Sequence, residues 1–81
     1  MAHVFLNGNL KLLAGGKREF QVKATNVRGL FKELSSLYPD LEHHLSEGIA
    51  VAIDGQIFQD AWLEEILPDS EVHLFPQIGG G

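Results

Sequence analysis

The sequence predicts an α+β domain in which one long helix packs against one face of a mixed β-sheet. Three observations lead to this fold class. Short segments near both ends of the sequence alternate between apolar and polar residues, as half-buried strands do. Residues 27–38 have apolar side chains at helical spacing. The order of strands first, then a single helix, then further strands is typical of a sheet with its helix on one face.

Two strands are predicted before the helix. The first covers residues 4–6 and the second covers residues 19–23, where the alternation is clean. Residues 7–9 break the chain after the first strand, and Gly15 and Gly16 turn it again. We therefore expect an antiparallel pair whose connection is longer than a two-residue hairpin, with the turn type left open.

The helix from Val27 to Tyr38 is the clearest signal in the sequence. Thr25 or Asn26 is placed to cap its N-terminus, and Pro39 is expected to end it. Because its other side is polar, the helix needs an apolar surface to lie on, which the strands provide. The apolar positions that recur at helical spacing are Val27, Leu30, Phe31, Leu34, Leu37 and Tyr38.

Two further strands are predicted after the helix. Residues 39–48 are polar and are expected to be irregular, with space for one short helical turn at residues 41–45. The small apolar residues 49–53 predict a central strand. Asp54-Gly55 is a strong signal for a tight turn into a short return strand at residues 56–58.

The remaining part of the domain predicts a helical turn and a final strand. Residues 60–67 are expected to form the turn, and Pro68-Asp69-Ser70 then leads into a strand at residues 71–75. The side chains of the helical turn that we expect to point inward are Trp62, Leu63, Ile66 and Leu67.

Length and composition exclude several classes of function. The 81 residues, 44% of them hydrophobic, suit one domain, so we expect residues 1–81 to form it, with residues 76–81 as an extended tail. A net charge of −5 disfavours binding to a phosphate backbone, so no nucleic-acid partner is expected. No cysteine is present, which excludes a thiolate metal site and a cysteine nucleophile.

The sequence also gives no sign of a membrane segment. No apolar stretch approaches the ~20 residues that a membrane-spanning helix needs. The first residues, Met1-Ala2-His3-Val4, lack the basic and apolar regions of a signal peptide. We therefore expect a cytoplasmic protein without a membrane partner.

The last residues, Pro76-Gln77-Ile78-Gly79-Gly80-Gly81, follow directly on the final predicted strand. Five residues beyond Pro76 span at most about 17 Å. Such a thread can enter a narrow channel in a partner enzyme where any Cβ would clash. Its carboxylate is inert until it is activated, usually by ATP-dependent adenylation, after which the acyl-adenylate accepts sulfide or an amine. The alternative is a frayed end without a function.

These segments together resemble one known family. The matching residues are Leu10-Lys11-Leu12-Leu13-Ala14-Gly15-Gly16, then Ala52-Ile53-Asp54-Gly55-Gln56, and then residues 68–76 before the glycines. In this order and spacing, the sequence is similar to the family of the small subunit of molybdopterin synthase and the thiamine-biosynthesis sulfur carrier. The resemblance covers essentially the whole chain and implies a ubiquitin-like β-grasp fold with strand order 2-1-5-3-4 and a flexible glycine tail.

The sequence departs from the family pattern at two places, and the second bears on the pathway. The turn before the last strand reads Pro68-Asp69-Ser70-Glu71 where the family usually has Asp-Gly-Asp-Glu, and Ser70 is expected to serve in that turn. The tail ends in three glycines rather than two, which is familiar among thiamine-type carriers. The Leu13-Ala14-Gly15-Gly16 segment and the long helix favour the molybdopterin branch.

The resemblance implies a sulfur carrier rather than an enzyme acting on its own. Gly81 is adenylated by an E1-like adenylating enzyme and then becomes a thiocarboxylate, while Gly79 and Gly80 let the tail thread its channel. The other partners implied are a sulfur donor protein and a larger catalytic synthase subunit that binds the pterin precursor. No cofactor is expected on this chain, and ATP belongs to the activating enzyme.

Alternation also predicts a docking surface. If the apolar residues of the first and last strands face the helix, Phe5 and Phe75 point to the opposite face of the sheet. An exposed aromatic patch beside the tail is a docking surface for a partner. Phe5, Phe75, Pro76 and Ile78 are therefore the predicted partner-binding residues. The alternative is a reversed register, or a loop that covers the two rings.

The four histidines predict no metal site. His43 and His44 are adjacent and diverge on a helix. His3 and His73 can lie on neighbouring strands, but two ligands without a carboxylate or thiolate rarely bind a metal. Solvated histidines are the better interpretation.

The acidic residues Asp60, Glu64 and Glu65 lack a nucleophile beside them and are interpreted as a solvated stretch. Gly15-Gly16 lacks the Lys-Ser/Thr of a phosphate loop. Three functions thus compete: a sulfur carrier of the molybdopterin or thiamine type, a ubiquitin-like modifier conjugated to lysines through the C-terminal glycine, and a plain interaction domain whose tail is unused.

Overall fold

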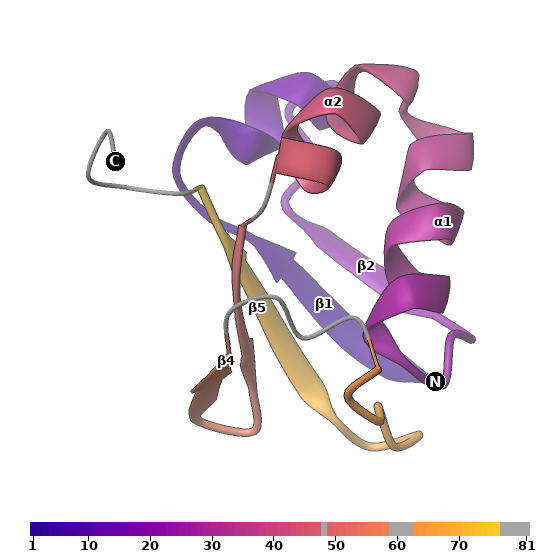
Figure 1. Ribbon diagram of the computed structural model, residues 1–81. Helices are drawn as coiled ribbons and strands as arrows, with labels where there is room; N and C mark the ends of the chain where they lie inside the picture. The colour runs from indigo at the N-terminus through magenta and orange to yellow at the C-terminus, as the bar shows by residue number, and fades with distance from the viewer. Residues whose placement is uncertain (48, 59–62, 77–81) are drawn as a thin grey trace.

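In the part of the chain that the computed structural model describes, residues 1–47, 49–58 and 63–76, five strands form one mixed sheet. The helical segments gather on one side of this sheet (Figure 1). In chain order the elements are β1 (Ala2–Leu6), the 3-10 helix η1 (Gly8–Ala14), β2 (Glu19–Val22), α1 (Val27–Leu37), α2 (Pro39–Glu47), β3 (Ala50–Ile53), β4 (Gln56–Phe58) and β5 (Glu71–Phe75).

The strand order is β2-β1-β5-β3-β4, which confirms the predicted topology. β1 and β5 are parallel, and the other neighbouring pairs are antiparallel. Val4 pairs with Val72 and Leu6 pairs with Leu74. Because paired residues point to the same face, the apolar side chains of the two central strands form one continuous surface.

Helix α1 packs on that surface, as predicted. Val27, Leu30 and Leu34 are 0% exposed and Phe31 is 6% exposed. Asn26 caps the helix, since its side-chain oxygen accepts a hydrogen bond of 2.7 Å from the backbone N–H of Gly29.

Of the last two apolar positions of the predicted helix, Tyr38 packs against the core and Leu37 does not. Leu37, the last residue of the helix, is 58% exposed. The chain changes direction at Tyr38, and Leu41 and Leu45 of the next helix fill the core instead, with 0% and 2% exposure. The prediction for Leu37 was therefore wrong because a second helix takes its place.

The irregular segment predicted at residues 39–48 is instead helix α2, over nine residues. Pro39 ends α1, as expected, and it is also the first residue of α2. Proline suits the first helical position because a backbone N–H there would have no partner within the helix, so its absence costs nothing. The φ angle of proline is also already helical. Proline alone therefore does not distinguish a helix end from a new helix start.

The connection between β1 and β2 also contains more structure than predicted. Leu10 and Ala14 of η1 are buried, with 0% and 1% exposure. Gly15 ends this 3-10 helix at a φ of +67°, a left-handed conformation that favours glycine. The break expected at residues 7–9 is thus the start of a short helix that contributes to the core.

Two predicted turns are confirmed. Asp54 and Gly55 have φ angles of +49° and +88°, as the tight hairpin turn between β3 and β4 requires. Ser70 is only 2% exposed, and its hydroxyl oxygen accepts a hydrogen bond of 2.9 Å from the backbone N–H of Leu67.

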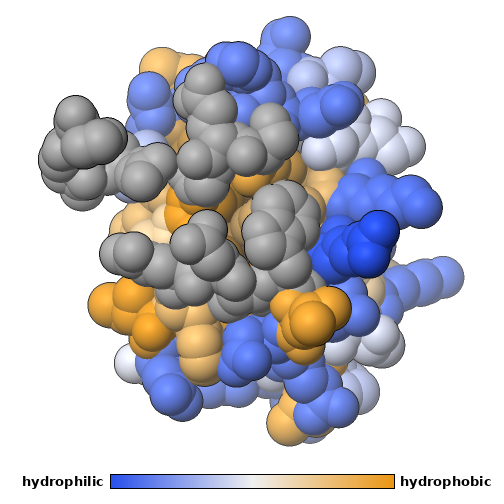
Figure 2. Space-filling model, viewed as in Figure 1, coloured by the Kyte–Doolittle hydropathy of each residue, from blue (hydrophilic) through white to orange (hydrophobic). Residues whose placement is uncertain are grey.

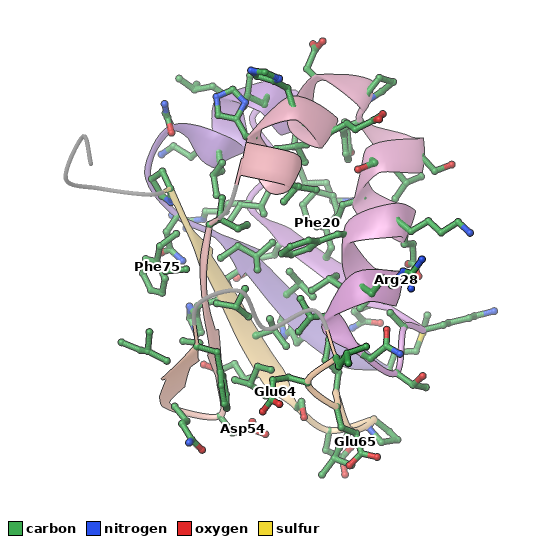
Figure 3. All side chains as sticks on the ribbon, in the orientation of Figure 1. Phe20, Arg28, Asp54, Glu64, Glu65 and Phe75 are labelled. Atoms are coloured by element: carbon green, nitrogen blue, oxygen red, sulfur yellow. The ribbon has the colours of Figure 1, made fainter. Side chains whose placement is uncertain are left out.

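The segment before this turn differs from the predicted helical turn. Val27 N–H donates to the carbonyl of Glu64 (3.0 Å), and Ile66 N–H donates to the carbonyl of Thr25 (2.8 Å). The chain is therefore paired in an extended form with the start of α1, near the Glu64 and Glu65 labels in Figure 3. Alternation then buries Ile66, at 2% exposure. The prediction for Leu63 and Leu67 was wrong, since they are 83% and 54% exposed.

The surface shown in Figure 2 has exposed hydrophobic groups between hydrophilic ones.

Two residues of the predicted helical turn, Trp62 and Asp60, lie outside the described residues. No helix in the described ranges has the length and apolar character that would let it cross a membrane. The large apolar residues exposed in the described part are Met1, Leu12, Leu37, Ile57, Leu63 and Leu67.

Candidate docking face and base of the tail

The face of the sheet opposite α1 is formed by the alternate residues of the central strands. Strand β1 follows the pattern buried, half-buried, buried from Ala2 to Leu6, and β5 places half-buried residues between buried Val72 and Leu74. Phe5 and Phe75 therefore lie on the face opposite the helix, as alternation predicted. Figure 3 shows the Phe75 ring on the side of the sheet away from α1.

Four rings line up on this face, and we call His3, Phe5, His73 and Phe75 the ring row. The ring centroids of His3 and Phe5 are 4.4 Å apart, those of Phe5 and His73 are 4.6 Å apart, and those of His73 and Phe75 are 6.3 Å apart. All three pairs are stacked, with interplanar angles of 29°, 11° and 18°. Each stacked aromatic pair contributes about 0.5–1.5 kcal/mol of stabilisation beyond that of its buried area, so the four rings hold one another in position.

The two histidines of the ring row are the residues that the sequence did not identify. His73 lies between Phe5 and Phe75, and its side chain is 31% exposed rather than fully solvated. His3 and His73 are two residues away from Phe5 and Phe75 along their strands, a spacing that places side chains on the same face. The contact itself depends on the pairing of Phe5 with His73 across strands that are distant in the sequence.

Strand register extends the apolar part of this face beyond the ring row. Ala52 pairs with His73 on one side and with Ile57 on the other, and Ile57 is 68% exposed. Ala50 pairs with Phe75. Small residues on β3 therefore lie between the half-buried rings and the exposed Ile57 at the edge strand.

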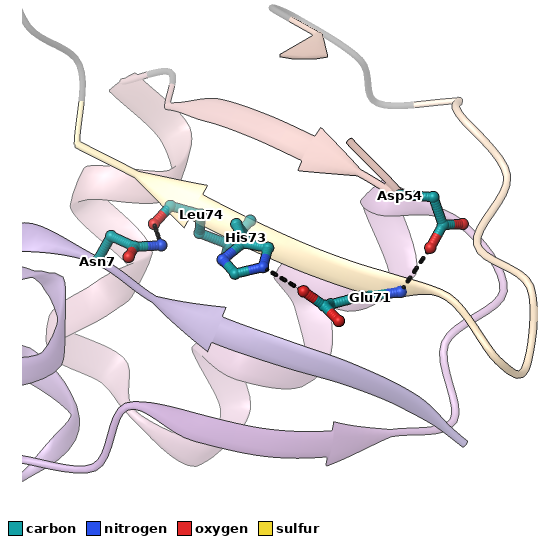
Figure 4. A network of polar contacts seen from close by, with 5 residues as sticks. All are labelled: Asn7, Asp54, Glu71, His73 and Leu74. Carbon is teal, nitrogen blue, oxygen red and sulfur yellow. Dashed lines mark hydrogen bonds and ion pairs between the residues drawn. The ribbon is translucent and has the colours of Figure 1, made fainter. Parts of the chain in front are cut away.

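Polar contacts mark the end of this face that lies away from the tail (Figure 4). Nε2 of His73 lies 2.8 Å from Oε1 of Glu71, whose side chain is 62% exposed. Such an exposed pair contributes at most about 1 kcal/mol, so its main effect is to orient the imidazole ring. Oδ1 of Asp54 accepts a hydrogen bond of 2.9 Å from the backbone N–H of Glu71, which ties the β3–β4 turn to the start of β5.

The base of the tail lies at the opposite end of β5. Strands β1 and β5 are parallel, so both end at the same edge of the sheet. The carbonyl of Leu74 accepts hydrogen bonds from the backbone N–H (2.9 Å) and from Nδ2 (3.2 Å) of Asn7, the residue that follows β1 (Figure 4). Pro76 is half-buried and is the last residue described. The predicted tail residues Ile78, Gly79, Gly80 and Gly81, with Gln77, lie outside the described residues.

The described residues contain no group of three or more His, Cys, Asp or Glu side chains that is able to hold a metal ion. The rings of His43 and His44 are 6.0 Å apart and perpendicular, on successive residues of α2. His44 differs from the expected solvated histidine, since its Nδ1 is buried and finds no hydrogen-bond partner among the described residues.

Comparison with known proteins gives both a family and a fold. The family model of the ThiS family matches residues 4–81. No curated protein matches the sequence. The structure of SAMP1 from Haloferax volcanii has 24% identity and a TM-score of 0.74, with 99% of this chain and 98% of that one covered. The small archaeal modifier protein 1 of Methanosarcina acetivorans has 22% identity and a TM-score of 0.81, covering 99% and 95%.

A third structural match includes a partner. A chain in the complex of subunits 1 and 2 of the molybdopterin-converting factor from Helicobacter pylori has 20% identity and a TM-score of 0.68, covering 99% of this chain and 97% of that one. At these identities the structural matches show the fold alone. The fold is the ubiquitin-like β-grasp that the resemblance implied, with the same strand order.

Proposed function

This chain belongs to the ThiS family, and on that premise we propose that it carries sulfur as a thiocarboxylate on the terminal carboxyl group of Gly81. The carboxylate attacks the α-phosphate of ATP on an activating enzyme, and pyrophosphate leaves. Sulfide from a sulfur donor protein then attacks the acyl-adenylate carbonyl, and AMP leaves with the electron pair of the broken C–O bond. The product is a thiocarboxylate that a second enzyme uses as its sulfur source.

The observation that supports this proposal most strongly is the extent of the family match, which runs through the three glycines to residue 81. The described residues also place a firm aromatic face beside the base of the tail. A carrier has to dock by one surface and present its reactive end beside it. The ring row and Pro76 are therefore proposed to contact the partner together with Ile78, while Gly79 and Gly80 thread the channel.

The partner that we propose for sulfur delivery is a larger catalytic subunit of the molybdopterin synthase type. The Helicobacter pylori match, in which a similar chain is part of a two-subunit molybdopterin-converting factor, favours this pathway over thiamine synthesis. On this proposal the chain contributes the reactive end and the partner binds the substrate, so the chain is not an enzyme on its own.

A ubiquitin-like modifier is the second candidate, and the match to the small archaeal modifier protein 1 of Methanosarcina acetivorans favours it. Both functions use the same fold, tail and activation, and they differ in the final acceptor. Sulfur carriage predicts an intact protein heavier by about 16 Da, since sulfur replaces oxygen. Conjugation predicts an adduct with a partner lysine in a cell extract.

The test of the carrier function is to shorten and to block the tail. Deleting Gly81 moves the carboxylate back by roughly 3.5 Å, and misplacements of even ~1 Å can reduce a rate a hundredfold. Gly80→Val adds a side chain that we expect to be excluded from a narrow channel. The assay is ATP–pyrophosphate exchange with the cognate activating enzyme, followed by intact-mass detection of the thiocarboxylate.

Thermal unfolding of each variant is the control, because a change in the tail should not alter the folded domain. If both variants were adenylated and thiolated as fast as the wild type, the tail would not be the reactive segment. If neither the wild type nor the variants were adenylated, the interaction domain with an unused tail would be supported instead.

A further inference from the structure

At the base of the tail, the backbone of Gly8 lies against the ring of Pro76. Gly8 follows Asn7 and begins η1 with a φ of +62°. A Cβ on Gly8 would lie 2.9 Å from Cγ and 3.1 Å from Cδ of Pro76. Carbon atoms in contact normally lie about 3.5–4.0 Å apart. The proline ring therefore rests directly on the backbone of Gly8, in space that any other residue would occupy.

The side chain of Asn7 supports the same point from a second direction. Asn7 holds the N-cap position of η1, where asparagine usually accepts a hydrogen bond from the first turn of its own helix. It makes no such capping bond here. Its Nδ2 instead donates to the carbonyl of Leu74, which also accepts from the Asn7 backbone N–H. The side chain is thus used to hold β5 rather than to stabilise η1.

We propose that Asn7 and Gly8 are positioning residues that fix where, and in which direction, the C-terminal tail leaves the domain. Asn7 hydrogen-bonds the carbonyl of Leu74, and Gly8 packs against the ring of Pro76. These two contacts lie on either side of Phe75 in the sequence. The inference rests on the proposed function, because the direction of the tail matters only if Gly81 is the reacting end. It adds two residues that are neither in the ring row nor in the glycine tail.

The physical reason is the short reach of the tail. Five residues beyond Pro76 span at most about 17 Å, so a tail drawn out along a partner's channel has little spare length with which to correct an error at its base. A change in direction of about 10° at Pro76 moves the end of such a tail by about 3 Å. Misplacements of ~1 Å already reduce rates by about a hundredfold.

The test compares Gly8→Ala with Gly15→Ala. Gly8 is the first residue of η1 and Gly15 caps its end, and their φ angles are nearly equal, +62° and +67°, so an added methyl group strains the backbone similarly at both. A Cβ at Gly15 meets nothing within 4 Å, whereas a Cβ at Gly8 meets Pro76. Any difference in adenylation rate between the two variants is therefore caused by the contact with Pro76.

Steady-state ATP–pyrophosphate exchange with the cognate activating enzyme is the measurement. We expect Gly8→Ala to lower kcat at least about tenfold, with KM for the carrier within about twofold because the four rings of the ring row are unchanged. Gly15→Ala should keep both constants within about twofold of the wild type. Equal kcat values for Gly8→Ala and Gly15→Ala would overturn the role of Gly8.

A double-mutant cycle tests whether the contact is direct. Pro76→Ala removes Cγ and Cδ, the two atoms that the new methyl group would meet. In the Pro76→Ala background, Gly8→Ala should therefore lower kcat by no more than about twofold, as expected for two side chains that interact. A loss as large as in the wild-type background would show independent sites and contradict the contact.

Asn7→Ala keeps the proposal testable should Gly8→Ala fold poorly. We expect it to lower kcat about threefold or more at unchanged KM, and Asn9→Ala, at an exposed neighbour, to have no effect. Equal rates for these two variants would remove Asn7 from the proposal. If the wild type and Gly15→Ala were not adenylated at all, the sulfur-carrier function would be refuted. If both were adenylated and Gly8→Ala had the same kcat, only the inference about Gly8 would be refuted.

Discussion

Replacing Leu34 by alanine tests the packing on which the whole arrangement depends. Leu34 is 0% exposed and lies on the face of α1 that covers the sheet. Truncating a fully buried leucine costs about 2–5 kcal/mol, because the transfer energy is lost and a cavity remains. The free energy of unfolding of a domain with 81 residues is roughly 4–12 kcal/mol, so one substitution removes a large share of it. The midpoint of thermal unfolding should fall by about 10 °C or more.

Leu37→Ala is the matched control, because it changes the same residue type one turn further along the same helix. Leu37 is 58% exposed, and we expect its truncation to alter the free energy of unfolding by no more than about 0.5 kcal/mol. Both variants are unfolded in urea and followed by far-UV circular dichroism, with the midpoint and the slope compared. If Leu34→Ala were no more costly than Leu37→Ala, α1 would not pack by the face assigned to it.

Two further substitutions test the docking face and the turn before β5. Phe75→Ala should weaken binding of the larger catalytic subunit at least about tenfold by titration calorimetry with the fold intact, as expected for an aromatic anchor at an interface. Leu12→Ala, at a residue that is 70% exposed on η1, should bind as the wild type does, and unchanged affinity for Phe75→Ala would remove the ring row from the docking surface. Ser70→Ala should lower the free energy of unfolding by about 1–3 kcal/mol, because the backbone N–H of Leu67 loses its acceptor. The control is Ser36→Ala, on the exposed side of α1. If Ser70→Ala lowered the free energy of unfolding no more than this control does, the role of Ser70 in the turn would be contradicted.

The sequence determined the features that depend on near neighbours. The spacing of Val27, Leu30 and Leu34 specifies one face of a helix without reference to the rest of the chain. Asp54-Gly55 specifies its turn through the φ angles that the two residues accept. Alternation alone assigned Phe5 and Phe75 to the face opposite the helix, because side chains along a strand point to opposite faces in turn.

The same local signals failed where a residue has two possible local roles. Pro39 ends one helix and begins another, and sequence patterns record only that the first helix stops there. Leu63 and Leu67 are apolar residues near a buried isoleucine, but their exposure follows from the pairing of residues 64–66 with residues 25–27. That pairing joins segments about 40 residues apart, beyond the reach of any periodic pattern.

Which residues meet at the candidate site depends on strand pairing between distant parts of the chain. His73 enters the ring row because β5 lies parallel to β1 in a register that places it opposite Phe5. Asn7 reaches the carbonyl of Leu74 across 67 positions of sequence, and Gly8 lies under Pro76 for the same reason. Register is set by the burial of the whole apolar face of the sheet, since a slip by one residue would turn that face to solvent. Contacts fixed by such collective burial cannot be read from the residues that make them.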